Sequence, residues 1–109
     1  MLVRVCNIDP LVGLKKGSVP FLKLITQTKR KISDNRFIEY KIWLLDEPKP
    51  GSEHLYAYRM VYIVDGARIV GFDNERGKGD HCHLDGEEQP YYFVNVKTLI
   101  SDFLAAVRK

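Results

Sequence analysis

The chain has 109 residues, of which 45% are hydrophobic and 28% are charged, and this composition is ordinary for a soluble globular protein of one domain. Its longest stretch without a charged residue or a histidine is 89–96, whereas a membrane-spanning helix needs about 20 apolar residues, so no membrane-spanning helix is expected. Two cysteines, Cys6 and Cys82, are too few for a disulfide scaffold. We expect a single domain over residues 1–109, located in the reducing cytoplasm and without membrane contact.

The positive charges are concentrated in the first part of the chain. Residues 1–41 contain nine Lys or Arg against three acidic residues, whereas residues 42–109 contain eight against eleven. The basic part includes the triplet Lys-Arg-Lys at 29–31. Such a bias is compatible with a polyanionic partner, although a solvated hairpin is the simpler explanation of the triplet alone.

The first half of the chain predicts two strands. Residues 1–20 have no clear period and predict no defined element. Residues 21–29 alternate between apolar and polar, and residues 36–46 are rich in β-branched and aromatic side chains, so each predicts a strand. Residues 47–52, with two prolines and a glycine, end the second strand, and His54 just after them is expected at the surface. The second strand has one face with Ile38, Tyr40, Ile42 and Leu44 and another with Phe37, Glu39, Lys41 and Trp43.

Residues 55–73 predict a β-hairpin around Asp65 and Gly66, because a type I′ turn needs positive φ at both central positions. A two-residue loop fixes the register of the two strands. Counting outward from the turn places Asp73 opposite Tyr58. We therefore expect Asp73 at the open end of the hairpin, beside a tyrosine hydroxyl.

The last third of the chain predicts a long loop, a short strand and a helix. Residues 74–90 have neither period, and such long loops in compact domains are usually functional or disordered. Residues 91–94 predict the last strand, and Asn95 is a good N-cap for an amphipathic helix. The apolar stripe of this helix is Val96, Leu99, Ile100, Phe103 and Val107. Together the elements predict an α+β fold, an antiparallel β-meander of four to five strands with a C-terminal helix packed on one face.

Residues 73–83, with the sequence DNERGKGDHCH, have no aliphatic side chain and gain little from being ordered. They are not a Walker A phosphate loop, because the glycine spacing differs and Gly79 stands where the motif has a hydroxyl. The backbone amides of this Gly-rich turn, together with Arg76 and Lys78, could still bind a phosphodiester.

The same residues could bind a metal ion. His81 and His83 are two positions apart, so on an extended segment both imidazoles point to one side and Cys82 points to the other. The two histidines could supply two ligands and Asp73 or Asp80 a third, although the cysteine pairs of zinc sites are absent. We expect no cofactor, and a bound divalent metal ion is the alternative.

The histidines also suit the cleavage of a phosphodiester. Histidine titrates near neutral pH and can act as a general base or a general acid. Arg59, Arg76 and Lys78 could supply positive charge where negative charge develops on phosphorus. With RNA as the substrate, the 2′-hydroxyl is the nucleophile and no metal is required. The simplest alternative is a solvent-exposed polar turn without chemistry.

Residues 54–93, HLYAYRMVYIVDGARIVGFDNERGKGDHCHLDGEEQPYYF, are followed by an amphipathic helix with Asp-Phe, and this pattern resembles the TumE-type toxin family of bacterial toxin–antitoxin operons. The family signature has a Tyr-Arg strand, a Gly turn, a strand ending in Asp-Asn, then Glu-Arg-Gly-Lys-Gly-Asp-His and a second His. The resemblance covers residues 36–107, and residues 73–81 fit position by position. Cys82 departs from it, because a basic residue, usually Arg, is expected there.

This resemblance implies a small cytoplasmic toxin that a protein antitoxin neutralises. Nuclease action on RNA is the natural expectation for its activity. The motif residues that it carries over are Tyr58, Arg59, Asp73, Asn74, Glu75, Arg76, Lys78, Asp80, His81 and His83.

The leading hypothesis is a metal-independent ribonuclease toxin. Its histidines would exchange protons, its cations would bind the phosphate, and an aspartate would orient a histidine. The side chains expected to take part in the chemistry are His81, His83, Lys78, Arg76, Asp73 and Asp80. Those expected to contact the substrate are Arg59, Tyr58, Asn74 and Glu75.

Two alternatives stay open beside this hypothesis. The first is a non-catalytic protein- or RNA-binding module whose interaction site is residues 73–83. The second is a metal-dependent nuclease that uses His81, His83 and Asp73. The expected partners are the cognate antitoxin and RNA, and a homodimer is left open.

Overall fold

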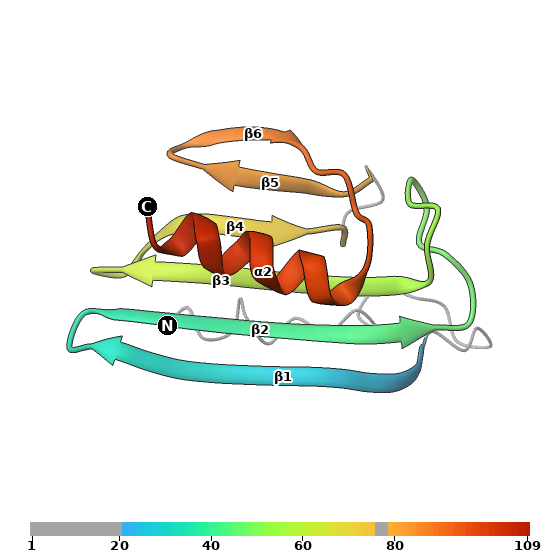
Figure 1. Ribbon diagram of the computed structural model, residues 1–109, viewed down its shortest axis with the longest axis horizontal. Helices are drawn as coiled ribbons and strands as arrows, with labels where there is room; N and C mark the ends of the chain where they lie inside the picture. The colour runs from blue at the N-terminus through green and yellow to red at the C-terminus, as the bar shows by residue number, and fades with distance from the viewer. Residues whose placement is uncertain (1–20, 76–78) are drawn as a thin grey trace.

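The computed structural model describes residues 21–75 and 79–109, which form a six-stranded antiparallel sheet with a helix on one face (Figure 1). The strands lie in chain order, so every neighbouring pair is also consecutive in the sequence. The α+β class is confirmed, with six strands rather than four to five. The elements are β1 (Phe21–Ser33), β2 (Arg36–Leu45), β3 (Tyr56–Val64), β4 (Ala67–Asp73), β5 (His81–Leu84), β6 (Glu87–Pro90) and α2 (Val96–Val107).

Both predicted strands are present: β1 extends to Ser33, beyond its predicted end at residue 29, and β2 ends at Leu45, one residue before its predicted end. Ile38 and Ile42 of β2 belong to the core under α2, whereas Phe37 packs with a small cluster on the opposite face. The basic triplet 29–31 lies within β1, where it pairs with residues 37–39, and the turn falls after it. The triplet is therefore part of a strand and not the tip of a hairpin.

The turn between β3 and β4 has the predicted conformation. Asp65 and Gly66 have φ values of 52° and 81°, as a type I′ turn requires. Val64 and Ala67 flank the turn as a pair. The side-chain amide of Asn35 donates to Asp65 Oδ1 at 2.8 Å and joins this turn to the preceding one.

The predicted register of this hairpin is wrong beyond its first two pairs. Ile69 is an extra residue in β4, and it shifts the pairing by one so that Asp73 lies opposite Arg59 instead of Tyr58. The physical reason is burial. The shift turns Phe72 toward α2, where it is only 3% exposed, and leaves Ile69 38% exposed. Asp73 consequently lies on the face of the sheet opposite the helix.

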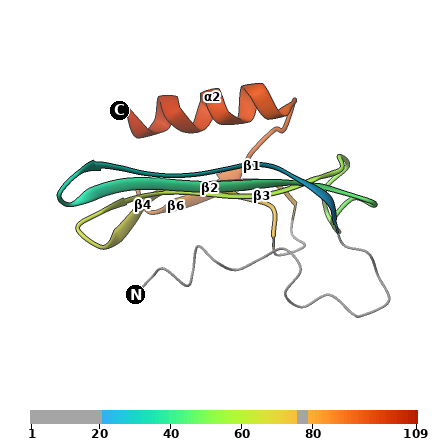
Figure 2. The same cartoon turned by 90° about the horizontal axis from the view of Figure 1, so that it is seen from below.

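Residues 74–90 contain a second hairpin that the sequence reading missed. Strands β5 and β6 are joined by Asp85 and Gly86, which have φ values of 51° and 84°. These strands, HCHL and EEQP, have no β-branched or aromatic residue, so nothing in their composition favoured a strand. Residues 91–94, predicted as a strand, instead carry the chain from β6 over to α2, as Figure 2 shows from the side.

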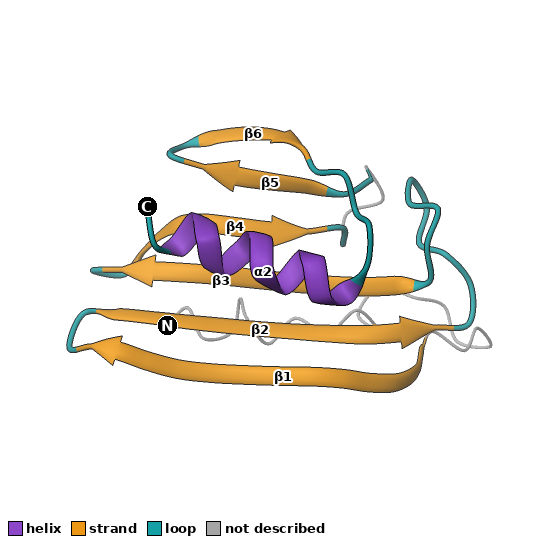
Figure 3. Ribbon diagram, viewed as in Figure 1, coloured by secondary structure: helices purple, strands orange, loops and turns teal. Residues whose placement is uncertain are grey.

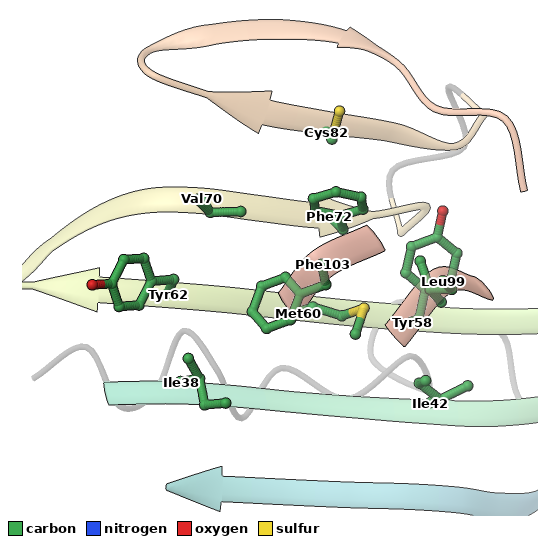
Figure 4. Packing of buried hydrophobic residues seen from close by; sticks show 10 residues of the cluster. All are labelled: Ile38, Ile42, Tyr58, Met60, Tyr62, Val70, Phe72, Cys82, Leu99 and Phe103. Atoms are coloured by element: carbon green, nitrogen blue, oxygen red, sulfur yellow. The ribbon is translucent and has the colours of Figure 1, made fainter. Parts of the chain in front are cut away.

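Helix α2 confirms its predicted start and its apolar stripe (Figure 3). The Asn95 side chain accepts a hydrogen bond from the backbone N–H of Thr98 at 2.7 Å and caps the helix. Leu99 and Phe103 are fully buried against the sheet, with the other stripe residues packed around them. Figure 4 shows the core that they complete, which consists of Ile38, Ile42, Tyr58, Met60, Tyr62, Val70, Phe72, Cys82, Leu99 and Phe103.

Candidate functional site

The sheet separates two clusters of polar side chains near the start of β5. Successive residues of an extended chain point to opposite faces, so Asp80 lies on the side of α2 and His81 on the other side. Cys82 returns to the core, as expected from its position between the histidines. The histidine cluster consists of Asp73, His81, His83 and Glu88. The Asp80 cluster consists of Ser52, His54, Tyr58, Asn74 and Asp80.

A carboxylate lies between the two imidazoles of the histidine cluster. The rings of His81 and His83 have their centroids 6.0 Å apart and stand nearly edge to face. Glu88 of β6 places Oε2 at 3.4 Å from His81 Nε2 and Oε1 at 3.6 Å from His83 Nε2. His81 Nε2 also lies 3.3 Å from Oδ1 of Asp73, its neighbour across the ladder. The expected convergence of the two histidines and Asp73 is present.

Both ring nitrogens of His81 face oxygen atoms that can only accept hydrogen bonds. Nδ1 lies 3.2 Å from the carbonyl oxygen of Gly79, and Nε2 lies between the carboxylates of Asp73 and Glu88. The doubly protonated imidazolium is the form that can donate to all of them. The surroundings of His81 therefore suit a proton donor.

His83 has different surroundings from His81. Burial lowers its pKa below the ordinary value, and the nearby positive charge of Arg68 lowers it further, against the opposing effect of Glu88. Its Nδ1 is buried and has no hydrogen-bond partner among the described residues. The neutral imidazole is thus favoured at His83, which suits a proton acceptor.

A partly buried ion pair lies beside the histidine cluster. Arg59 Nη1 is 3.4 Å from Glu75 Oε1, and the Glu75 backbone N–H donates to Asp73 Oδ1 at 3.3 Å. Burial raises the pKa of Glu75 to about 6, although Arg59 and Lys49 act in the opposite direction. Lys49 also donates to the Glu75 carbonyl at 3.2 Å. Through Glu75, these contacts connect Asp73 to Arg59 in β3 and to Lys49 in the segment before β3.

One side of the histidine cluster opens into a cavity of about 300 Å³. Because His81 and Glu88 are both at its wall, a small anion could reach the imidazole from this side. Asp80, Gln89 and Pro90 complete the lining.

The Asp80 cluster is a saturated hydrogen-bond network. Oδ1 of Asp80 accepts from Ser52 Oγ at 2.5 Å, and Oδ2 accepts from the Tyr58 hydroxyl at 2.7 Å and lies 2.6 Å from His54 Nε2. Burial raises the pKa of Asp80, but the hydrogen bonds from His54, Ser52 and Tyr58 outweigh it and hold that pKa below its ordinary value. Asn74 is fully buried and donates to Ser52 Oγ at 3.2 Å.

His54 is the residue that the sequence reading missed. It was expected at the surface, but its side chain is only 17% exposed and its ring stacks on Phe93 with a centroid distance of 3.8 Å. The signal was the spacing of His54, Tyr56 and Tyr58, which places three ring side chains on one side of an extended segment that leads to the site.

The predicted site residues are thus divided between the two faces. Asp73, His81 and His83 come together, with Arg59 and Glu75 beside them. The expected substrate contacts Tyr58 and Asn74 are fully buried in the other cluster, where the Tyr58 hydroxyl donates to Asp80. The two loop cations, Arg76 and Lys78, lie outside the described residues.

The three predicted ligands of the alternative metal site all lie among the described residues 21–75 and 79–109. No three His, Cys, Asp or Glu of these residues are placed to hold a metal ion. The set of His81, His83 and Asp73 therefore has no support from the described geometry, and a metal requirement stays a prediction.

The sequence that forms this sheet and this site matches a family of known proteins. A family model described as toxin TumE matches residues 20–109. The chain belongs to the TumE toxin family. Searches of curated proteins and of solved structures found no match. The TumE match begins ahead of the resemblance seen in residues 36–107, and it includes all of β1.

Membership of the TumE family makes the chain a toxin of a toxin–antitoxin system, for which an antitoxin is the partner. In the described part of this TumE protein, no helix is long and apolar enough to cross a membrane.

Proposed function

We propose that this toxin is a ribonuclease that cleaves RNA by metal-independent acid–base catalysis in the cytoplasm. The observation that supports it is the pair of imidazoles 6.0 Å apart with one carboxylate between them. Glu88 occupies the space where both Nε2 atoms point. A phosphodiester is also an anion, and it could take the place of this exposed carboxylate between the rings.

The two histidines have different roles in this proposal. His81, whose ring nitrogens both face acceptors, is the general acid that protonates the leaving oxygen. His83, which favours the neutral form, is the general base that takes the proton of the RNA 2′-hydroxyl. A ring whose nitrogens face acceptors, beside a ring that favours the neutral form, gives the two histidines the different roles that acid–base catalysis needs.

The positive charge that the reaction needs has to come from several places. Arg68 acts on His83, and Arg59 lies in the next strand but pairs with Glu75. The carboxylates of the histidine cluster offset these charges. We therefore retain Arg76 and Lys78 as the proposed phosphate ligands, because they lie within three residues of Glu75 in the sequence.

Cleavage of labelled RNA tests the proposal. The purified protein is incubated with single-stranded RNA of mixed sequence, with and without EDTA, beside His81→Ala, His83→Ala and Lys78→Ala. We expect cleavage that EDTA does not affect, and a loss of about 10²-fold or more in each histidine variant. The same oligonucleotide with 2′-deoxy sugars should stay intact, because its nucleophile is missing.

Growth arrest on expression is the matched measurement in cells. The histidine variants should lose toxicity, whereas Lys97→Ala, an exposed change on α2, should keep it. Equal toxicity of the wild type and His81→Ala would contradict catalysis and favour the non-catalytic binding module. Activity that disappears with EDTA would favour the metal-dependent alternative.

A further inference from the structure

The Asp80 carboxylate is a rigid point in the chain directly before β5. Its two oxygens receive hydrogen bonds from three side chains at 2.5 to 2.7 Å, and its own side chain is only 9% exposed. Two of the donors, Ser52 and His54, come from the segment before β3, and the third, Tyr58, comes from within β3. Buried charge-assisted hydrogen bonds of this length hold a side chain in one orientation.

The hydrogen-bond partners of His54 show that it does not act as an acid–base group in this arrangement. Its Nδ1 accepts the backbone N–H of Tyr56 at 3.1 Å, so the neutral ring carries its proton on Nε2 and donates it to Asp80. Tyr58 is a donor as well, because burial and the Asp80 carboxylate hold its pKa far above the ordinary value. Both ring nitrogens of His54 are engaged in hydrogen bonds, so the cluster holds the Asp80 side chain in place and does not transfer protons.

The chain around Gly79 leaves little freedom between the Asp80 cluster and His81. Gly79 has a φ of 92°, which only glycine adopts without strain, and a Cβ there would lie 3.1 Å from the carbonyl oxygen of Gly51. The Gly79 carbonyl oxygen in turn faces His81 Nδ1 at 3.2 Å. In the sequence, Asp80 therefore lies between Gly79, whose carbonyl oxygen contacts the His81 ring, and His81 itself.

We propose that Asp80 is a positioning residue, held by His54 and Tyr58, that fixes the orientation of the His81 imidazole on the opposite face of the sheet. Because consecutive side chains of an extended chain are about half a turn apart, fixing the side chain of Asp80 fixes the direction of the next one. His81 then meets Asp73 and Glu88. The catalytic meaning of this orientation rests on the proposed ribonuclease function.

The test compares the His81 imidazole in the wild type and three variants. Long-range ¹H–¹⁵N spectra report the chemical shifts of the two ring nitrogens of His81, which depend on the tautomer and the hydrogen bonds of the ring and need no activity. Thermal unfolding reports whether each variant is folded. Asp80→Asn and His54→Ala should shift both nitrogen signals of His81. In His54→Gln the side-chain amide can donate to Asp80 as Nε2 of His54 does. Most of the His81 signal intensity should therefore return to the wild-type positions.

RNA cleavage provides the second readout of the same variants. Misplacement of a catalytic group by about 1 Å can cost about 10²-fold in rate, so Asp80→Asn and His54→Ala should lower kcat by about tenfold or more. KM should stay within about twofold, because neither residue is proposed to touch the substrate. His54→Gln should recover most of kcat.

Asp65→Asn is the matched control. It also removes a carboxylate that accepts a side-chain hydrogen bond, from Asn35 at 2.8 Å, but it does so at the turn between β3 and β4. This variant should leave the His81 signals unchanged. Unchanged His81 signals in folded Asp80→Asn or His54→Ala, or no recovery in His54→Gln, would overturn the positioning role.

The outcomes separate the two proposals. If the wild type does not cleave RNA, the ribonuclease proposal fails, but the His81 spectra still decide whether Asp80 positions this ring. If Asp80→Asn does not fold, the two His54 variants decide the same question, since they change the donor and leave the carboxylate in place.

Discussion

At the scale of single residues, the two histidines differ because the sheet gives them different neighbours. His81 pairs with Asp73 in the ladder, and His83 pairs with Gly71, which has no side chain to offer. Glu88 is the one carboxylate of the cluster that approaches both rings. A difference of two ladder positions is thus enough to place one imidazole among acceptors and to leave the other with a buried, unpartnered nitrogen in the described part of the chain.

Glu75 provides a pH-dependent prediction at this scale. Burial raises its pKa from 4.5 to about 6, so the protonated form is favoured on folding, and the contribution is present below pH 4.5 and lost as the pH rises through 6. The free energy of unfolding of the wild type should therefore fall, relative to Glu75→Gln, by about 2 kcal/mol over this interval. Urea unfolding at a series of pH values measures it.

Glu47→Gln is the control for Glu75, because Glu47 is an exposed carboxylate outside the sheet. Its stability should run parallel to that of the wild type over the same pH range. Parallel curves for the wild type and Glu75→Gln would show that the burial of Glu75 has no influence on stability.

At the scale of elements, α2 depends on its N-terminal cap. Asn95→Ala leaves the N–H of Thr98 without its side-chain acceptor and should lower the free energy of unfolding by about 1 kcal/mol. Asn95→Ser, which keeps an oxygen at this position, should stay within a few tenths of a kcal/mol of the wild type. Urea unfolding of the three proteins compares them, and equal losses in both variants would mean that the cap is not the cause.

The sequence predicted those elements whose side chains carry a periodic pattern. Strands β2 to β4 and helix α2 were found because apolar residues repeat along them, and the Asp65-Gly66 turn was found because only a few residues accept its φ values. Strands β5 and β6 are held mainly by ladder hydrogen bonds and have polar sequences, so no pattern indicated them. Residues 91–94 looked like a strand because of their aromatic residues, but Tyr91 and Phe93 pack against the core instead.

The candidate site was predictable only in part, for a related reason. The period of two correctly placed His81 and His83 on one side and Cys82 on the other. The side on which Asp73 lies depends on the extra residue Ile69, which has no signature in a run of residues that all suit a strand. The partner of Asp80 depends on a contact between segments more than 20 residues apart, and no local pattern reports it.

At the scale of the whole molecule, the bulge at Ile69 takes up one extra residue, so that Phe72 still faces the helix. Deletion of Ile69 should remove the bulge and leave the pairs from Tyr62–Val70 to Arg59–Asp73 in place, so Phe72 stays beneath α2 and Asp73 on the opposite face. The free energy of unfolding should therefore change by no more than about 1 kcal/mol, and the toxin should still arrest growth.

Phe72→Ala is the contrast to this deletion, because it removes a ring that is only 3% exposed under α2. It should lower the free energy of unfolding by about 3 kcal/mol or more. A deletion variant that loses as much stability as Phe72→Ala would contradict the assignment of Ile69 as the extra residue.

The order of the strands places basic residues of the first part of the chain at an edge of the sheet. β1 is the outer strand of the sheet and has 13 residues, so it presents a long row of backbone groups on its free side in the described part of the chain. An exposed edge strand can pair with a strand of another molecule, and lysines along the edge are a common protection against such pairing. Lys23, Lys29, Arg30 and Lys31 lie along it. Their mutual repulsion would keep neighbouring toxin molecules from joining into fibres, whatever else these charges attract.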